Sequence, residues 1–424
     1  MSTNEISADL LVVGAGIAGI TAAVEAAETG LSVILVEKRP YIGGKVAQFS
    51  KYFPKLCPPA CGLEINIRRL RSNPLIRLYT MAEVSTNILN DSGKHEVNIH
   101  LKPRYVNNKC TACGECVKVC QGRRKNEFNF NMDETTCIYI PYENAYPQKY
   151  IIDKKNCEGR CCSKCAEVCK YGAIDLEDEG AVIPAVVDSI IWAAGWEPYD
   201  AKNLDVLGFG RFPDVITNVM MERLASPDGP TKGKILRPST NEKINSVAFV
   251  QCAGSRDENH LEYCSSVCCM ASLKHIKYVR EQYPDAEVHF HYIDVRASGM
   301  LEDFYRSIQS DNKVHFHKGK VGKVTGSVSG KLIVHSEDTL TGKLIQNEVE
   351  LVVLATGMKP STAGLPIESS AIDKNGFISF NGSLSSQSSG LTGCGVITEP
   401  KDVASAVQEA TGSILKAIRT IKRN

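Results

Sequence analysis

The sequence has almost no net charge. Its 49 Lys and Arg residues are balanced by 48 Asp and Glu residues, which leaves a formal net charge of +1 at pH 7. A chain this close to neutrality produces no field that draws it to nucleic acid or anionic lipid. We therefore expect no nucleic-acid partner.

The sequence also lacks a hydrophobic run long enough to cross a bilayer. The longest apolar stretch, Leu10 to Val24, is rich in Gly and Ala and ends at Glu25, whereas a spanning helix needs about 20 residues. The first ten residues lack the basic segment that precedes the apolar part of a signal peptide. We expect a cytoplasmic protein, with any membrane link made through partners.

Cysteine, by contrast, is abundant, with 17 residues in a chain of 424. Secreted proteins rich in disulfides are usually small. This chain is long enough for two or three domains of roughly 100–200 residues, and its cysteines cluster at metal-ligand spacing. Metal binding is therefore the better interpretation.

The N-terminal segment has the pattern of a dinucleotide-binding βαβ unit. An apolar strand at 9–13 precedes a Gly-rich turn, a helix over about 16–29 and a second strand at 32–36, which is followed by Glu37. The glycines of such a turn let a pyrophosphate approach the helix N-terminus, and the acidic residue accepts hydrogen bonds from the ribose. The turn consists of Gly14, Ala15, Gly16, Ile17, Ala18 and Gly19.

Further motifs favour FAD over NAD. Gly43 and Gly44 follow the acidic residue, as in flavoprotein disulfide reductases, and Trp192 to Gly195 resembles a strand ending of those enzymes. Gly393-Cys394-Gly395 resembles their C-terminal flavin motif, although the usual Asp is absent. The predicted FAD set beyond the turn is Glu37, Lys38, Gly43, Gly44, Lys45, Val84, Ala194, Gly195, Gly395 and Lys401, with Val84 on a strand that would cover the adenine.

Between about residues 107 and 180 the sequence is typical of a ferredoxin insertion. One run has the spacing C-x2-C-x2-C-x3-C, which holds [4Fe–4S] clusters in bacterial ferredoxins, where the fourth cysteine binds the other cluster. A zinc ribbon is the alternative, but it needs paired C-x2-C knuckles. We expect one cluster on Cys110, Cys113, Cys116 and Cys169, and a second on Cys157, Cys162, Cys165 and Cys120, with Cys161 competing with Cys162 and Cys137 not needed.

A second dinucleotide-binding-like unit begins near residue 245, but its nucleotide loop is degenerate. After the strand that ends at Gln251, the loop reads Cys252-Ala253-Gly254-Ser255-Arg256 and lacks the second and third glycines. We favour a third cluster on Cys252, Cys264, Cys268 and Cys269. Buried structural thiols and a redox dithiol remain alternatives. The prolines between Cys57 and Cys61 favour a loop there, and these two cysteines are left unassigned.

Nearly the whole chain resembles the A subunit of heterodisulfide reductase. The stretches that carry the resemblance are Gly14–Gly19, Gly43-Gly44 with Phe53-Pro54, the ferredoxin insertion, Phe249–Asp257, Tyr263–Met270 and Asp294–Ala297. A shorter form, with Cys394-Gly395 and Pro400–Val403, resembles the A subunit of the quinone-interacting membrane-bound oxidoreductase complex. This resemblance implies electron transfer between adenylylsulfate reductase and the quinone pool in dissimilatory sulfur metabolism, peripheral to the inner membrane and next to a quinone-reactive partner subunit.

The predicted fold is α/β: a thioredoxin-reductase-like flavoprotein with two dinucleotide-binding-like domains and an inserted ferredoxin-like α+β domain. We expect the FAD-binding domain at 1–106, the insertion at 107–180, a connector at 181–244, the second domain at 245–348 and the C-terminal part of the FAD domain at 349–424. Two alternative functions are a soluble heterodisulfide reductase A-like flavoprotein, with or without electron bifurcation, and a flavin-containing scaffold for neighbouring clusters.

Overall fold

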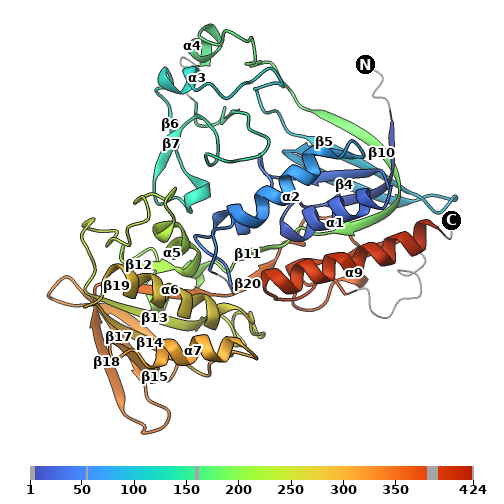
Figure 1. The fold of residues 1–424 in the computed structure, drawn as a ribbon. Helices are drawn as coiled ribbons and strands as arrows, with labels where there is room; N and C mark the ends of the chain where they lie inside the picture. Colours follow the sequence, from blue (N-terminus) through green and yellow to red (C-terminus); the bar gives the residue numbers. More distant parts are fainter. Residues whose placement is uncertain (1–4, 54–55, 158–161, 380–389, 423–424) are drawn as a thin grey trace.

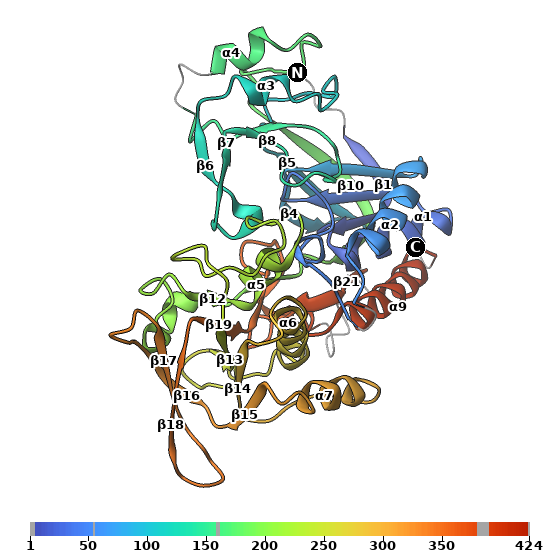
Figure 2. The same ribbon diagram turned by 60° about the vertical axis from the view of Figure 1, so that its left-hand side comes forward.

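The fold is described from a computed structural model covering residues 5–53, 56–157, 162–379 and 390–422. Pro54 and Cys161 lie outside the described residues, as does the side chain of Cys162. Figures 1 and 2 show three parts: a flavoprotein-like sheet, an insertion above it and a second sheet beside both. None of the helices in the described ranges combines the length and apolarity of a membrane-spanning segment.

The first part is a seven-stranded sheet in the order β3-β2-β1-β10-β5-β4, with β21 paired to β10. Leu10 and Val12 of β1 point to one face and pack against three helices, whereas Leu11 and Val13 pack on the opposite face. This alternation is the two-residue period of a strand buried on both sides. The elements are β1 (Ile6–Val13), α1 (Ile17–Glu28), β2 (Val33–Glu37), α2 (Ala60–Ser72), β3 (Ile76–Thr80), β4 (Ala82–Leu89), β5 (His95–Leu101), β10 (Ala181–Trp192), β21 (Leu391–Gly393) and α9 (Val403–Ile421).

The insertion leaves this sheet after β5 and returns to it at β10. Its two ends lie side by side, because Val106 pairs with Ile174 and the amide of Asn107 donates to the carbonyl of Ala173. The insertion therefore leaves the parent sheet uninterrupted. Its elements are α3 (Glu115–Lys118), β6 (Arg123–Lys125), β7 (Glu134–Thr136), β8 (Ile138–Tyr139), β9 (Ile151–Ile152) and α4 (Cys162–Glu167).

The second part contains a five-stranded parallel sheet in the order β12-β19-β13-β14-β15, with a three-stranded antiparallel sheet against one face. Helices α5, α6 and α7 cover the other face. Two short strands, β11 and β20, connect the two parts as an antiparallel pair. The elements are β11 (Trp196–Pro198), β12 (Val215–Thr217), α5 (Asn218–Ala225), β13 (Ser246–Ala253), α6 (Cys268–Gln282), β14 (Glu287–Tyr292), α7 (Leu301–Gln309), β15 (Val314–Lys318), β16 (Val321–Gly326), β17 (Leu332–Glu337), β18 (Leu344–Val349), β19 (Leu351–Thr356) and β20 (Met358–Pro360).

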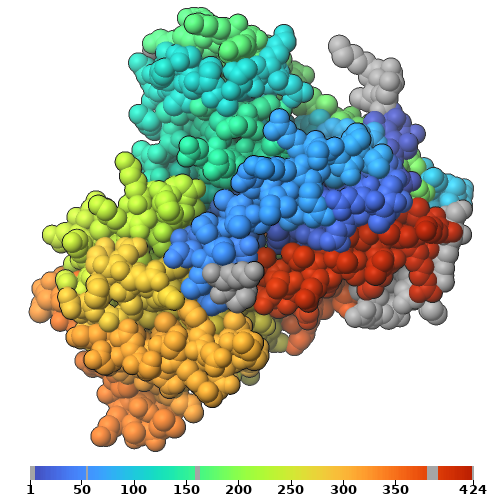
Figure 3. All heavy atoms as spheres, in the orientation of Figure 1, coloured from blue at the N-terminus to red at the C-terminus, as the bar shows by residue number. Residues whose placement is uncertain are grey.

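The C-terminal helix α9 packs against α1 and lies along the surface of the first part (Figure 3). Asp402 caps its N-terminus by accepting a hydrogen bond from the Ser405 amide at 2.8 Å. Ala410 and Ile414 of α9 join the same apolar cluster as Ala22 of α1. Residues from the two ends of the chain thereby build one domain.

Candidate functional site

The three glycines of the first turn have different neighbours. A Cβ on Gly14, where φ is +103°, would lie 2.4 Å from the Ala193 oxygen, and one on Gly19 would lie 1.8 Å from the Gly14 oxygen. These two glycines are therefore required by packing alone. A Cβ on Gly16 would meet only the Cα of Gly44, at 4.0 Å, so this position is open toward a ligand.

The N-terminus of α1 suits a bound phosphate. No side chain caps it, and its first turn carries no acidic residue. The orphan amides at a helix N-terminus and the helix dipole attract anions. The residues present therefore fit the pyrophosphate of a dinucleotide.

Glu37 holds the turn in shape from the end of β2. Its carboxylate is buried and accepts hydrogen bonds from the Ala15 amide at 2.7 Å and the Arg39 amide at 2.8 Å. Burial raises the pKa of Glu37. The carboxylate sits at the edge of the Gly-rich turn, which is where the fingerprint places the ribose-binding acid.

Residues far apart in the sequence converge on the start of α1. The Gly43 amide donates to the Ala15 carbonyl at 2.7 Å. A Cβ on Gly44 would lie 2.9 Å from the Gly16 Cα, and one on Gly395 would lie 2.9 Å from the Ala18 Cβ. Ala194, next to Gly195, borders Gly14. Most of the predicted FAD set therefore surrounds a single turn.

Val84 lies elsewhere on the same sheet. It is a buried residue of β4 and packs in the apolar cluster that contains Val36 and Trp192. Its predicted contact with the adenine stays a prediction.

Glu197, which the sequence analysis did not single out, pairs with three basic side chains. Two of them, Lys38 and Lys45, belong to the predicted FAD set, and the third is Arg39. The Glu197 carboxylate pairs with Lys38 at 3.5 Å, with Arg39 at 2.9 Å and with Lys45. Burial opposes ionisation of Glu197, but the charges of Lys45 and Arg39 outweigh it and lower its pKa. Burial lowers the pKa of Lys45 to about 8. Arg39, Lys45 and Glu197 line a cleft of about 300 Å³ whose other wall is the insertion.

Glu409 lies next to Gly393-Cys394-Gly395, the flavin motif from which the usual Asp is absent. Its carboxylate accepts hydrogen bonds from the Gly395 amide and from Lys401 Nζ, each at 2.6 Å. It also accepts from the Thr398 hydroxyl at 2.8 Å. A carboxylate from α9 thus stands beside Gly395, and it reaches the motif across 14 residues of sequence.

Cysteines from both ends of the insertion line one small recess. Cys110, Cys113 and Cys116 come from the first run and Cys169 from the second, with Ile138 and Tyr150 among the other lining residues. The predicted crossed arrangement of ferredoxin ligands is the arrangement that brings these four together. This recess fits a cubane cluster.

The second predicted set lies in the same apolar core. Cys120, Cys157 and Cys165 are buried there, next to the fully buried Cys137. Cys137 Sγ contacts the Asn156 carbonyl at 3.2 Å. Cys137, which the sequence treated as not needed, therefore packs beside this set.

The third set gathers at the C-terminal end of β13. Burial raises the pKa of Cys268, and the next contributions come from Cys269, Cys252 and Cys264. The four thiols therefore lie within electrostatic range of one another. Cys252 has φ of +54°, a left-handed conformation that non-glycine residues rarely adopt. The adjacent Gln251 is buried, and among the described residues neither its amide oxygen nor its amide nitrogen has a hydrogen-bond partner.

The ligands of a single metal ion must lie closer together than the cysteines that hold an iron–sulfur cluster. Within the described ranges, no three His, Cys, Asp or Glu side chains stand close enough together to hold one metal ion. In a four-iron cluster held by four cysteines the ligands are spread over the cluster.

The structure corrects one sequence expectation about Cys57 and Cys61. The two prolines between them favour a loop, but Cys61 lies in the first turn of α2, where Pro59 stands at the N-cap. Proline is compatible with a helix N-terminus because the amide N–H that it lacks would have no hydrogen-bond partner within the helix at that position. Both thiols lie near the Tyr52 hydroxyl, whose pKa is raised by burial and then by Cys61 and Cys57.

The second dinucleotide-like part has no short Gly-rich turn between β13 and α6. Residues 254–267 fill that position, and Cys268 and Cys269 occupy the start of α6. Arg256 is held across the loop by an ion pair with Asp294 at 2.6 Å. Side chains therefore stand where the pyrophosphate of NAD(P)H would bind.

We expect NADH and NADPH to reduce the purified holoprotein slowly or not at all, because the second nucleotide loop is blocked. Stopped-flow absorbance of the flavin after mixing with micromolar nicotinamide cofactor measures this. Stoichiometric bleaching within seconds would contradict the expectation.

A protein-family profile described as FAD dependent oxidoreductase matches residues 9–53. The A subunit of the ferredoxin/F420H2-dependent CoB-CoM heterodisulfide reductase of Methanosarcina acetivorans is 40% identical over 366 residues, covering 85% of this chain and 46% of the relative. The A subunit of the H2:CoB-CoM heterodisulfide,ferredoxin reductase of Methanothermobacter marburgensis is 36% identical over 429 residues, covering 98% of this chain and 65% of the relative. Over most of its own length, the chain is therefore similar to the A subunits of heterodisulfide reductases.

Among solved structures, the thioredoxin reductase of T. acidophilum matches with a TM-score of 0.54 and 14% identity, covering 99% of both chains. That likeness confirms the predicted thioredoxin-reductase-like fold. The chain also matches, in residues 9–53, the profile of FAD-dependent oxidoreductases. It spans about half to two thirds of the length of the two relatives.

Proposed function

We propose that the chain is an FAD and iron–sulfur electron-transfer component of a heterodisulfide reductase-like complex. The observation that carries this proposal is the position of the cysteine recess. It lies in an insertion that directly contacts the loop at residues 43–51, which we call the FAD loop because it follows β2 and Glu37. Gln48, four residues beyond Gly44, donates through Nε2 to the Phe128 carbonyl of the insertion at 2.9 Å.

FAD takes up or releases electrons in pairs, whereas each cluster passes one electron at a time. The residues around the start of α1 would bind the dinucleotide. The cysteines at 110–169 would hold two [4Fe–4S] clusters, and those at 252–269 a third. The chain would then convert between two-electron and one-electron transfer.

The partners follow from the relatives. Both relatives described above are named as A subunits of heterodisulfide reductases, which supports a place in a complex with further subunits. Their names favour the heterodisulfide reductase-like role over the role between adenylylsulfate reductase and quinone. The latter rests on the stretch with Cys394-Gly395 and Pro400–Val403, and is kept as a second candidate.

A redox experiment on the anaerobically purified holoprotein tests the electron-transfer function. After rapid reduction of the flavin, we expect flavin reoxidation to coincide with the appearance of reduced-cluster EPR signals. A flavin that cannot be reduced, or clusters that stay oxidised at every accessible potential, would support the scaffold alternative.

Isolation of the native complex separates the two partner assignments. Turnover of a thiol–disulfide substrate by that complex supports the heterodisulfide reductase-like role. Quinone-dependent oxidation, together with co-purified adenylylsulfate reductase, supports the second candidate.

A further inference from the structure

Helix α5 carries two neighbouring buried charges at the meeting point of all three parts. Glu222 is 4% exposed and Arg223 is 0% exposed. Buried charges are costly unless they are paired and hydrogen-bonded. The partners of these two residues come from different parts of the chain, which is uncommon for charges on so short a helix.

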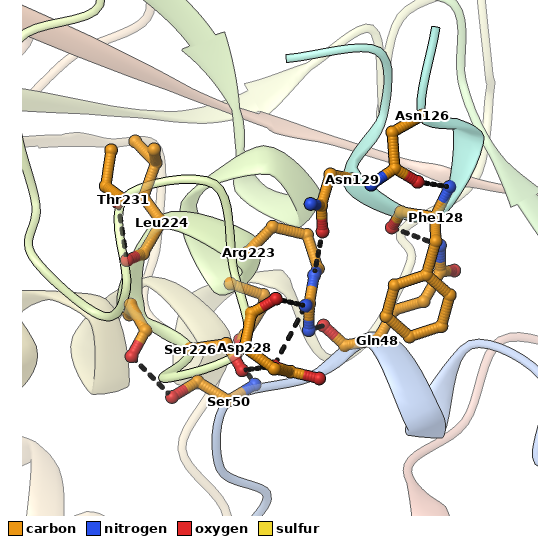
Figure 4. A network of polar contacts seen from close by, with 12 residues as sticks. Gln48, Ser50, Asn126, Phe128, Asn129, Arg223, Leu224, Ser226, Asp228 and Thr231 are labelled. Atoms are coloured by element: carbon orange, nitrogen blue, oxygen red, sulfur yellow. Dashed lines mark hydrogen bonds and ion pairs between the residues drawn. The ribbon is translucent and has the colours of Figure 1, made fainter. Parts of the chain in front are cut away.

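Arg223 binds the FAD loop and the insertion at once (Figure 4). Its Nε donates to Asn129 Oδ1 at 2.8 Å, and its Nη1 donates to the Gln48 carbonyl at 3.2 Å. Nη2 donates to the carbonyl and carboxylate of Asp228 at 3.1 and 2.9 Å. A rigid guanidinium fork is suited to fix several acceptors in one geometry.

An aromatic cluster reinforces the contact on the insertion side. The Arg223 guanidinium lies 4.6 Å from the centre of the Phe128 ring. That ring stacks on Tyr142 at 4.7 Å and meets Tyr41, near the Gly43-Gly44 loop, edge-on at 5.5 Å. The insertion is therefore packed onto the FAD loop as well as hydrogen-bonded to it.

Glu222 connects the segment around Ser50 to α6, which belongs to the second part, as α5 does. Its carboxylate accepts from the Ser50 amide at 3.0 Å, from Lys274 Nζ at 2.5 Å and from His275 Nε2 at 2.7 Å. Burial opposes ionisation of Glu222, but the charge of Lys274 and the hydrogen bonds from His275 and Lys274 outweigh it and lower its pKa to about 2. The carboxylate is therefore charged at neutral pH.

Lys274 and His275 lie on α6, the helix that begins with Cys268 and Cys269. Lys274 Nζ also donates to the Lys51 carbonyl at 2.6 Å. The segment from Gln48 to Lys51 is thus held from two sides, by the part with the first two cysteine sets and by the part with the third.

We propose that Glu222 and Arg223 are positioning residues that fix both cysteine-bearing parts against the FAD loop and so set the distances for electron transfer. This inference rests on the proposed function. Arg223 holds the insertion, and Glu222 holds α6. Neither residue is among the predicted FAD or cluster ligands.

The test uses the holoprotein with Arg223→Ala and Glu222→Gln. In Arg223→Ala we expect faster hydrogen exchange in residues 48–51 and 126–129, and flavin-to-cluster transfer into the insertion slower by on the order of tenfold, as expected for a small misplacement of reacting groups. Midpoint potentials should stay unchanged.

Glu222→Gln should instead give faster hydrogen exchange in residues 50–51 and in α6. Arg237→Ala is the matched control, because the Arg237–Asp214 ion pair at 2.7 Å lies within the second part.

Wild-type exchange and wild-type transfer rates in both variants would overturn the proposal. If Arg223→Ala does not fold, Asn129→Ala decides by the same two readouts, because it removes the acceptor of Nε, together with the Asn129–Asp133 hydrogen bond, but leaves Arg223 in place. A wild-type protein without flavin-to-cluster transfer contradicts the proposed function instead, and exchange protection at residues 48–51 then still reports on the junction.

Discussion

Replacing Gly16 with Trp is expected to abolish FAD binding while the chain still folds. Apart from its chain neighbours, the described residues place only the Gly44 Cα near a Cβ at this position, at 4.0 Å, so a large side chain would occupy the approach of the pyrophosphate rather than a packed interior. Flavin content falls from about one FAD per chain to almost none, since this glycine exists to let the pyrophosphate reach the backbone. Absorbance of the purified protein and chromatography of the released cofactor measure the loss.

The exposed Gly412 of α9 supplies the matched control, because no atom lies within 4 Å of a Cβ at that position. Gly412→Trp should keep its FAD. A Gly19→Val variant should fail differently, by misfolding, because its side chain would collide with the Gly14 carbonyl. A Gly16→Trp protein that is replete with flavin, or a released cofactor that is FMN, would contradict the FAD assignment.

The local parts of this fold were predictable because they follow from short-range patterns. The strand, helix and second strand expected at 9–13, 16–29 and 32–36 correspond to β1, α1 and β2. A strand, a tight turn and a helix in succession specify their own geometry. The sequence alone was enough for these elements.

The residues that the sequence reasoning missed act over long distances. Glu197 pairs with Lys45 across 152 positions, and Arg223 reaches Asn129 across 94. No spacing rule links such residues, because they meet only when separate parts pack together. A charged residue in an otherwise apolar segment, such as the Glu222-Arg223 pair between Met221 and Leu224, is the signal that could have drawn attention to them.

The third cysteine set is an intermediate case. Its spacing matches no standard cluster run, so the sequence left buried thiols and a dithiol open. The fold brings Cys252, at the end of β13, next to the three cysteines around the start of α6. Loss of the nucleotide loop leaves that crevice, where parallel sheets bind ligands, available to another redox group.

We expect the double variant Cys264→Ser, Cys268→Ser to lose about four irons per chain, because a [4Fe–4S] cluster is held by four cysteine thiolates. FAD content and the EPR signals of the insertion clusters should be retained, since the double variant leaves the ligands in residues 110–169 untouched. Iron analysis of anaerobically purified protein, with flavin absorbance on the same sample, gives the comparison.

Ser265→Ala is the control that separates ligand loss from disturbance of the loop. Ser265 is buried, and its hydroxyl accepts a hydrogen bond from the Met358 amide at 2.9 Å and lies 3.2 Å from the Ser255 hydroxyl. Removing that hydroxyl perturbs the loop but leaves all four thiols in place, so iron should be retained. Unchanged iron in the double cysteine variant would make these residues buried structural thiols, and equal iron loss in Ser265→Ala would attribute the effect to loop packing.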